Sequence, residues 1–165
     1  MKAILISING KHVDNILSGK KIAEIRKTIP NCELPIDVYI YCTKQDANYY
    51  IKNKIYNSMI NGKVVAKFRF ESYLKGKLID DEKFDNFFYD DYQLTRQELK
   101  DYVGNDVFYE WHIKNLEIFD KPKDLKDFLV FSHTVDGIGF KGEPKSFQVL
   151  KPLTKAPQSW CYVEV

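Results

Sequence analysis

Residues 18–27 hold the side chains best suited to chemistry. Lys21, Glu24 and Arg26 fall within six positions of one another. A carboxylate accepts hydrogen bonds and a guanidinium donates them in a planar fork, so a Glu next to an Arg can hold the polar edge of a nucleobase. On one face of a strand Glu24 and Arg26 would lie roughly 7 Å apart. The same spacing fits a surface salt-bridge ladder worth about 0–1 kcal/mol, and spacing alone leaves both interpretations open.

Three short elements must position this segment. Alternating apolar residues predict a strand at residues 2–7, and Asn9 is expected to cap a helix that Gly19 ends. A second strand is expected at residues 22–27, with Glu24 and Arg26 on the same face. The charged segment therefore begins where a helix stops.

The remaining chain predicts more strands than helices. Further strands are expected at residues 36–42, 63–73, 107–119, 146–150 and 160–165, and short helices at 43–59, 95–104 and 123–129. The stretch between 129 and 146 is expected to be loop-rich, because it holds Gly137, Gly139 and Gly142. We therefore predict an α+β fold: one domain over residues 1–165, a β-barrel of six or seven mostly antiparallel strands with three or four short helices.

Composition predicts a cytoplasmic chain without a membrane span. The 165 residues are 44% hydrophobic and 29% charged, which excludes a disordered or fibrous chain. No apolar stretch approaches the roughly 20 residues of a membrane helix. The three cysteines are widely spaced and favour reduced, structural thiols. None of His12, His112 and His133 has a partner at metal-ligand spacing, and the glycine-rich stretch lacks the helix that a dinucleotide site needs, so no metal or cofactor is expected.

Charge is distributed unevenly along the chain. Residues 1–77 carry 14 basic and 6 acidic residues, residues 78–106 carry 3 and 9, and residues 107–165 carry 8 of each. The basic part is compatible with nucleic-acid phosphates, although solubility alone explains it too. The segment 78–106 is acidic and rich in Phe and Tyr, as in an insertion. It is interpreted either as a packed lid or, around residues 80–92, as a docking surface for a basic partner protein.

The charged segment also carries a resemblance to a known family. Residues 18–27, Ser-Gly-Lys-Lys-Ile-Ala-Glu-Ile-Arg-Lys, resemble the G-x-K-x-x-E-x-R signature of the ASCH family, a branch of the PUA-like β-barrels. Residues 4–8, 13–17, 62–68, 109–113 and 157–162 resemble it more loosely, and the ending is similar to ASCH proteins of phage and bacterial genomes. The resemblance implies a small barrel with a cleft beside the first helix, and RNA or modified bases as ligands.

The resemblance also implies which residues bind. The expected ligand contacts are charged signature residues, one further arginine and two aromatic rings that could stack on a base: Lys21, Glu24, Arg26, Lys27, Arg69, Tyr109 and Trp111. The expected function is a module that binds nucleic acid, a nucleotide or a modified base, with RNA as the favoured partner.

An enzymatic alternative follows from the same resemblance. Some small ASCH proteins remove the acetyl group of N4-acetylcytidine with a lysine, a threonine and a later glutamate. Lys21 matches the lysine, which would need a lowered pKa or a proton-relay partner to activate the hydroxyl nucleophile. Glu24 stands at the threonine position and brings no hydroxyl, so Lys21 and Glu24 would be the catalytic pair. Glu71 and Glu98 are the candidates for the later glutamate.

Overall fold

A computed structural model describes residues 1–48, 58–78, 88–104, 107–140 and 142–165. Its helices are α1 (Gly10–Leu17) and α3 (Arg96–Val103), with 3-10 turns η1 (Ser58–Ile60) and η3 (Leu125–Asp127). Its strands are β1 (Lys2–Ile8), β2 (Ala23–Arg26), β3 (Ile36–Cys42), β4 (Val64–Phe70), β5 (Tyr73–Lys77), β6 (Phe88–Tyr89), β7 (Leu94–Thr95), β8 (Val107–His112), β9 (Lys114–Lys123), β10 (Leu129–Ile138), β11 (Pro144–Pro152) and β12 (Trp160–Glu164). In these ranges no helix has the length and apolar character that crossing a membrane requires.

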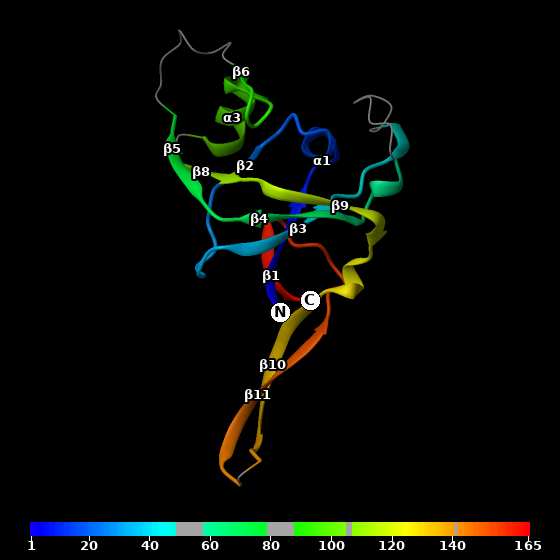
Figure 1. The fold of residues 1–165 in the computed structure, drawn as a ribbon, viewed down its shortest axis with the longest axis vertical. Coiled ribbons are helices and arrows are strands. Elements are labelled where there is room, and N and C mark those ends of the chain that lie inside the picture. Colours follow the sequence, from blue (N-terminus) through cyan, green and yellow to red (C-terminus); the bar gives the residue numbers. More distant parts are fainter. Residues whose placement is uncertain (49–57, 79–87, 105–106, 141) are drawn as a thin grey trace.

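The strands form one large sheet and two small ones. The large sheet has the order β11-β10-β12-β1-β3-β4-β9, and its β1–β3 pair is parallel whereas its other pairs are antiparallel. The second sheet has the order β2-β8-β5, and β6 pairs with β7. In Figure 1 the second sheet, α1 and α3 lie toward one end of the molecule, and the β10–β11 hairpin projects from the opposite end.

The first strand is apolar along its length because both of its faces are covered. Ile4 and Ile6 pack into one core cluster together with Val13 of α1, and Leu5 packs into a second cluster together with Val163 of β12. A strand buried on both faces has no need for polar alternation. This central position of β1 brings the start of α1 next to β2.

The predicted barrel and element counts need correction. The described strands number twelve rather than six or seven, and they form three sheets that do not close into a barrel. Two α-helices are described, instead of three or four short helices. Most of the expected helix at 43–59 lies outside the described residues. The mixed α+β class and the mostly antiparallel pairing are confirmed.

Two strand predictions differ in detail. The expected strand at 107–119 is interrupted at Ile113, so that β8 belongs to the small sheet and β9 to the large one. Asn115, the second residue of β9, adopts a φ of 48° just after this interruption. The stretch expected to be loop-rich instead forms the long β10–β11 hairpin, in which β10 ends at Ile138 and β11 begins at Pro144.

Candidate ligand-binding pocket

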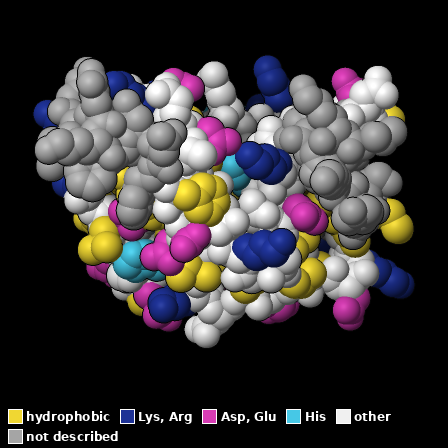
Figure 2. Space-filling view, turned by 90° about the horizontal axis from the view of Figure 1, so that it is seen from above, with side chains coloured by type: hydrophobic (Ala, Val, Ile, Leu, Met, Phe, Trp, Pro, Cys, Tyr) yellow, Lys and Arg dark blue, Asp and Glu magenta, His cyan; other side chains and the backbone are white. Residues whose placement is uncertain are grey.

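A cavity of about 300 Å³ lies where β1, α1, β2 and α3 meet. Its walls come from segments that are far apart in the sequence: Ser7, Ile8, Asn9, His12, Lys21, Glu24, Ile25, Arg26, Leu94, Glu98 and Tyr102. Basic, acidic and histidine side chains lie near one another on the face of the molecule seen in Figure 2.

The turn between α1 and β2 positions the charged segment. The Asn9 side chain accepts a hydrogen bond from the backbone N–H of Lys11 at 3.1 Å, which caps α1 as predicted. Gly19 adopts a φ of 74°, a left-handed conformation that side-chain-bearing residues rarely adopt, and it ends the helix. The backbone N–H of Lys21 then donates to the carbonyl of Asn15. This tight return places the signature side chains beside α1.

Lys21, Glu24 and Arg26 form a buried ion triad. Glu24 lies 3.2 Å from Lys21 Nζ through Oε2 and 3.0 Å from Arg26 Nη2 through Oε1, and the three side chains are at most 9% exposed. This burial rules out the surface ladder. Burial alone would raise the pKa of Glu24, but Lys21 and Arg26 hold that pKa below its usual value. The ionised triad therefore carries one excess positive charge.

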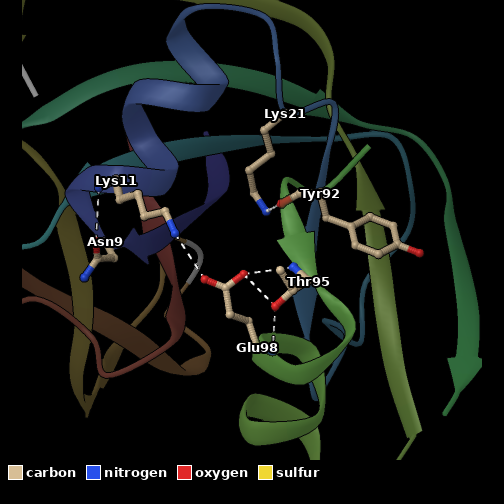
Figure 3. A network of polar contacts seen from close by, with 6 residues as sticks. All are labelled: Asn9, Lys11, Lys21, Tyr92, Thr95 and Glu98. Carbon is tan, nitrogen blue, oxygen red and sulfur yellow. Dashed lines mark hydrogen bonds and ion pairs between the residues drawn. The ribbon is translucent and has the colours of Figure 1, made fainter. Parts of the chain in front are cut away.

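Backbone carbonyls anchor both cations of the triad. Lys21 Nζ donates to the carbonyl of Tyr92 at 2.7 Å (Figure 3), and Arg26 Nη2 donates to the carbonyl of Ser7 at 2.7 Å. Arg26 Nη1 also lies 3.4 Å from Ser159 Oγ. The triad thus links β2 to β1 and to the acidic segment, so its geometry depends on the whole fold.

Helix α3 forms the wall opposite α1. Thr95 and Glu98 form the predicted capping box, in which Thr95 Oγ1 accepts from the Glu98 backbone N–H at 3.1 Å. Glu98 also pairs with Lys11 Nζ at 3.1 Å and so connects the two helices (Figure 3). Burial opposes ionisation, but bonds from Thr95 and Lys11 lower the pKa of Glu98. Of the two candidates for the later glutamate, Glu98 lines the cavity and Glu71 does not.

Three residues that line the pocket, His12, Ser7 and Tyr102, were not predicted from the sequence. His12 lines the cavity, and its Nδ1 is buried without a hydrogen-bond partner. Burial, and then the charge of Lys21, lower the pKa of His12. Helical spacing could have identified two of them, because residues four apart lie on the same face of a helix. His12 lies four residues before the buried Ile16, and Tyr102 lies four residues after Glu98.

The other predicted contacts lie around the pocket or away from it. Lys27 is exposed, and its Nζ lies 5.4 Å from the centre of the Tyr102 ring, at the rim. Tyr109 pairs with Arg26 in the β2–β8 register, is half-buried and does not line the cavity.

Two residues that were predicted to bind the ligand, Arg69 and Trp111, interact with other parts of the protein instead. Arg69 Nη1 donates to Asp37 Oδ1 at 2.7 Å on the large sheet. Trp111 is fully buried, and its ring stacks on Phe70 with centroids 4.6 Å apart. Neither side chain lines the cavity.

The described part of the acidic segment 78–106 is packed against the β2-β8-β5 sheet. Tyr92, Leu94, Leu99 and Val103 share a core cluster with residues of β2 and β8. This part therefore forms a wall of the pocket. Residues 79–87 lie outside the described ranges, so docking of a protein around 80–92 stays a prediction.

The pocket offers several kinds of contact to a ligand. Its triad is positively charged overall, and Arg26 Nε is a second buried atom without a hydrogen-bond partner. Ile8, Ile25 and Leu94 add apolar walls, and Tyr102 adds a ring. Nowhere in the described ranges do three or more His, Cys, Asp or Glu side chains gather as they would around a metal ion. This arrangement suits a small planar ligand with hydrogen-bond acceptors.

Solved structures resemble this fold. The ASCH protein of Zymomonas mobilis matches with 20% identity and a TM-score of 0.53, over 74% of this chain and 73% of that one. Its tyrosine-to-phenylalanine variant matches with 20% identity and 0.53, over 76% and 77%, and its serine-to-alanine variant with 17% and 0.60, over 98% and 88%. No protein-family model and no curated protein matches the sequence. The chain therefore has the fold of the ASCH domain, as the signature at residues 18–27 predicted.

Proposed function

We propose that the pocket binds a nucleobase or nucleoside, as a free molecule or at an unpaired position in RNA. The buried triad carries this proposal. It holds one excess positive charge beside two buried nitrogens without partners, Arg26 Nε and His12 Nδ1. An unsatisfied buried polar atom costs about 1–3 kcal/mol, so a ligand that bonds to these nitrogens would recover that cost.

Chemistry and size both favour a single base. Arg26 can donate to a ring carbonyl while Glu24 accepts from an adjacent N–H, the alternation that base edges present. A cavity of about 300 Å³ is at the lower end of the range for small-molecule pockets. A base splayed out of a single strand would fit such a site, whereas a stacked duplex would not. The ASCH fold supports an RNA-binding or hydrolase-type domain.

Thermal-shift screening followed by calorimetric titration tests the proposal. The panel holds common nucleosides, N4-acetylcytidine, and short RNA and DNA oligomers, since a ligand that binds the folded state raises its melting temperature. Tyr102→Ala is the test variant and Tyr73→Ala its control, because the two tyrosines are 40% and 39% exposed but only Tyr102 lines the cavity.

The expected result is a nucleoside or RNA ligand whose affinity falls in Tyr102→Ala and not in Tyr73→Ala. Loss of base stacking is worth about 1–3 kcal/mol, or roughly 5- to 150-fold in affinity. The proposal would be overturned if no ligand in the panel raised the melting temperature, or if both variants bound the ligand as tightly as the wild type.

A hydrolase is the second candidate, and the position of Glu98 is what favours it. Glu98 and Lys21 line the same cavity, so a carboxylate could activate water there without a hydroxyl at position 24. The salt bridge to Lys11 would have to open first. Acetate release from N4-acetylcytidine, lost in Glu98→Gln, would support hydrolysis. No release with enzyme in excess of substrate would exclude it for this substrate.

A further inference from the structure

The β10–β11 hairpin is a projecting arm with little support from the rest of the fold. Along the arm, β10 pairs with β12 only at Leu129, so the remainder is a two-stranded ribbon that extends away from the body (Figure 1). A two-stranded ribbon is at best marginally stable in water unless something packs on it.

This arm exposes apolar side chains at its tip and at its root. At the tip, Ile138 is 76% exposed and Phe140 is fully exposed. At the root, Leu129, Phe131 and Leu150 line a groove of about 330 Å³ together with β12. Such a concentration of exposed apolar side chains marks an interaction surface.

The register places Ile138 and the root residues on one face of the arm. A bulge lies between Phe131 and His133, and beyond it Ile138 pairs with Pro144, an even number of positions along β11 from Leu150. Between the two apolar ends the same face is polar, where Ser146 donates to Asp136 at 2.7 Å. From root to tip, the side chains on this face are thus apolar, then polar, then apolar. This order is the same from either end of the arm.

We propose that this face is a dimer interface, on which a second copy of the chain lies antiparallel about a two-fold axis. Each tip, Ile138 with Phe140, then enters the root groove of the other copy. At the rise of an extended strand, Leu129 and Ile138 lie about 30 Å apart along β10. The root contact and the tip contact of the proposed dimer are separated by this distance. A two-fold interface requires a self-complementary surface, and this face has one.

Charge favours a second copy over nucleic acid. Residues 129–152 carry three lysines and two acidic residues, too small a surplus to hold a phosphate backbone. The root groove is balanced in charge, because Lys2 and Glu164 both line it, and it therefore does not attract a polyanion either. Lysines and terminal prolines on β11 disfavour pairing through its edge, which leaves the face as the contact.

Light scattering after gel filtration, from about 1 to 200 μM protein, tests the oligomeric state. We expect a concentration-dependent dimer for the wild type and a monomer for Ile138→Asp/Phe140→Asp, with the dissociation constant raised at least tenfold. Because both tip residues are exposed, the melting temperature of dilute protein should not change. Leu74→Asp is the control, since Leu74 is 57% exposed on β5, outside the arm, and should still dimerise.

A cross-linking experiment tests the antiparallel geometry. Ile138→Cys and Phe131→Cys are made separately in a background with Cys32 and Cys161 replaced by serine. A disulfide dimer is expected only when the two proteins are mixed. A monomeric wild type at 200 μM, a dimer that survives the tip substitutions, or cross-linking of Ile138→Cys to itself would overturn the proposal. So would a monomer whose RNA or protein binding is lost with the tip.

Discussion

Replacing Glu24 by glutamine should lower the free energy of unfolding by about 3–5 kcal/mol. The substitution keeps the size of the side chain but removes the only carboxylate of the buried triad, which lies 3.2 Å from Lys21 Nζ and 3.0 Å from Arg26 Nη2. Removing one partner of a buried ion pair has this cost because the other charge stays buried and uncompensated. For a domain of this size each kcal/mol lowers the melting temperature by about 2–4 °C, so a fall of roughly 6–20 °C is expected.

The effect of Glu24→Gln should depend on pH in a defined direction. Because the folded-state pKa of Glu24 lies below the usual 4.5, its contribution to stability is fully present above that value. It is lost as the pH falls through the folded-state pKa. The stability difference between wild type and variant should therefore be constant from neutral pH to about 5 and shrink in stronger acid.

Urea unfolding of four variants checks this reasoning: Glu24→Gln, Lys21→Met, the two combined, and one control. Glu117→Gln is the control, since Glu117 pairs with Lys67 at 3.2 Å but is 59% exposed, and it should cost no more than about 1 kcal/mol. Lys21→Met/Glu24→Gln removes one charge of each sign, so it should cost less than the sum of its single substitutions. A neutral-pH cost below about 1 kcal/mol for Glu24→Gln, or strict additivity in the double variant, would refute the account of the triad.

Two further substitutions probe the walls of the pocket. His12 has a folded-state pKa below 6.5, so the unfolded chain takes up its proton first and the protein loses stability as the pH falls below about 6.5. His12→Asn should flatten this dependence in urea midpoints measured at pH 5 and 7.5, and an unchanged slope would contradict the burial of the neutral imidazole. Thr95→Ala removes the cap of α3 and should cost about 1 kcal/mol in the same assay. Thr134→Ala, at an exposed position of the arm, should leave the free energy of unfolding almost unchanged. Equal losses of stability in the two variants would contradict the role of Thr95 as a cap.

Local elements could be predicted because their signals lie within a few residues. The Asn9 cap, the left-handed Gly19 and the Thr95–Glu98 capping box each depend on neighbours along the chain. The division of residues 107–119 between two sheets could not be predicted, because strand partners come from distant segments. The β10–β11 hairpin was missed for a related reason: its glycines resemble a loop until the pairing register is known.

The candidate site shows the same division. The sequence by itself determined that Lys21, Glu24 and Arg26 share one short segment, and its spacing left a surface ladder and a binding cleft both open. Only the tertiary structure decided for a buried triad, because Ser7 and Tyr92 supply carbonyls from segments far from β2. The meeting of α1 with α3 added the remaining walls. The free energy of an ion pair depends more on its burial than on the spacing of its residues in the sequence, and burial is a property of the whole fold.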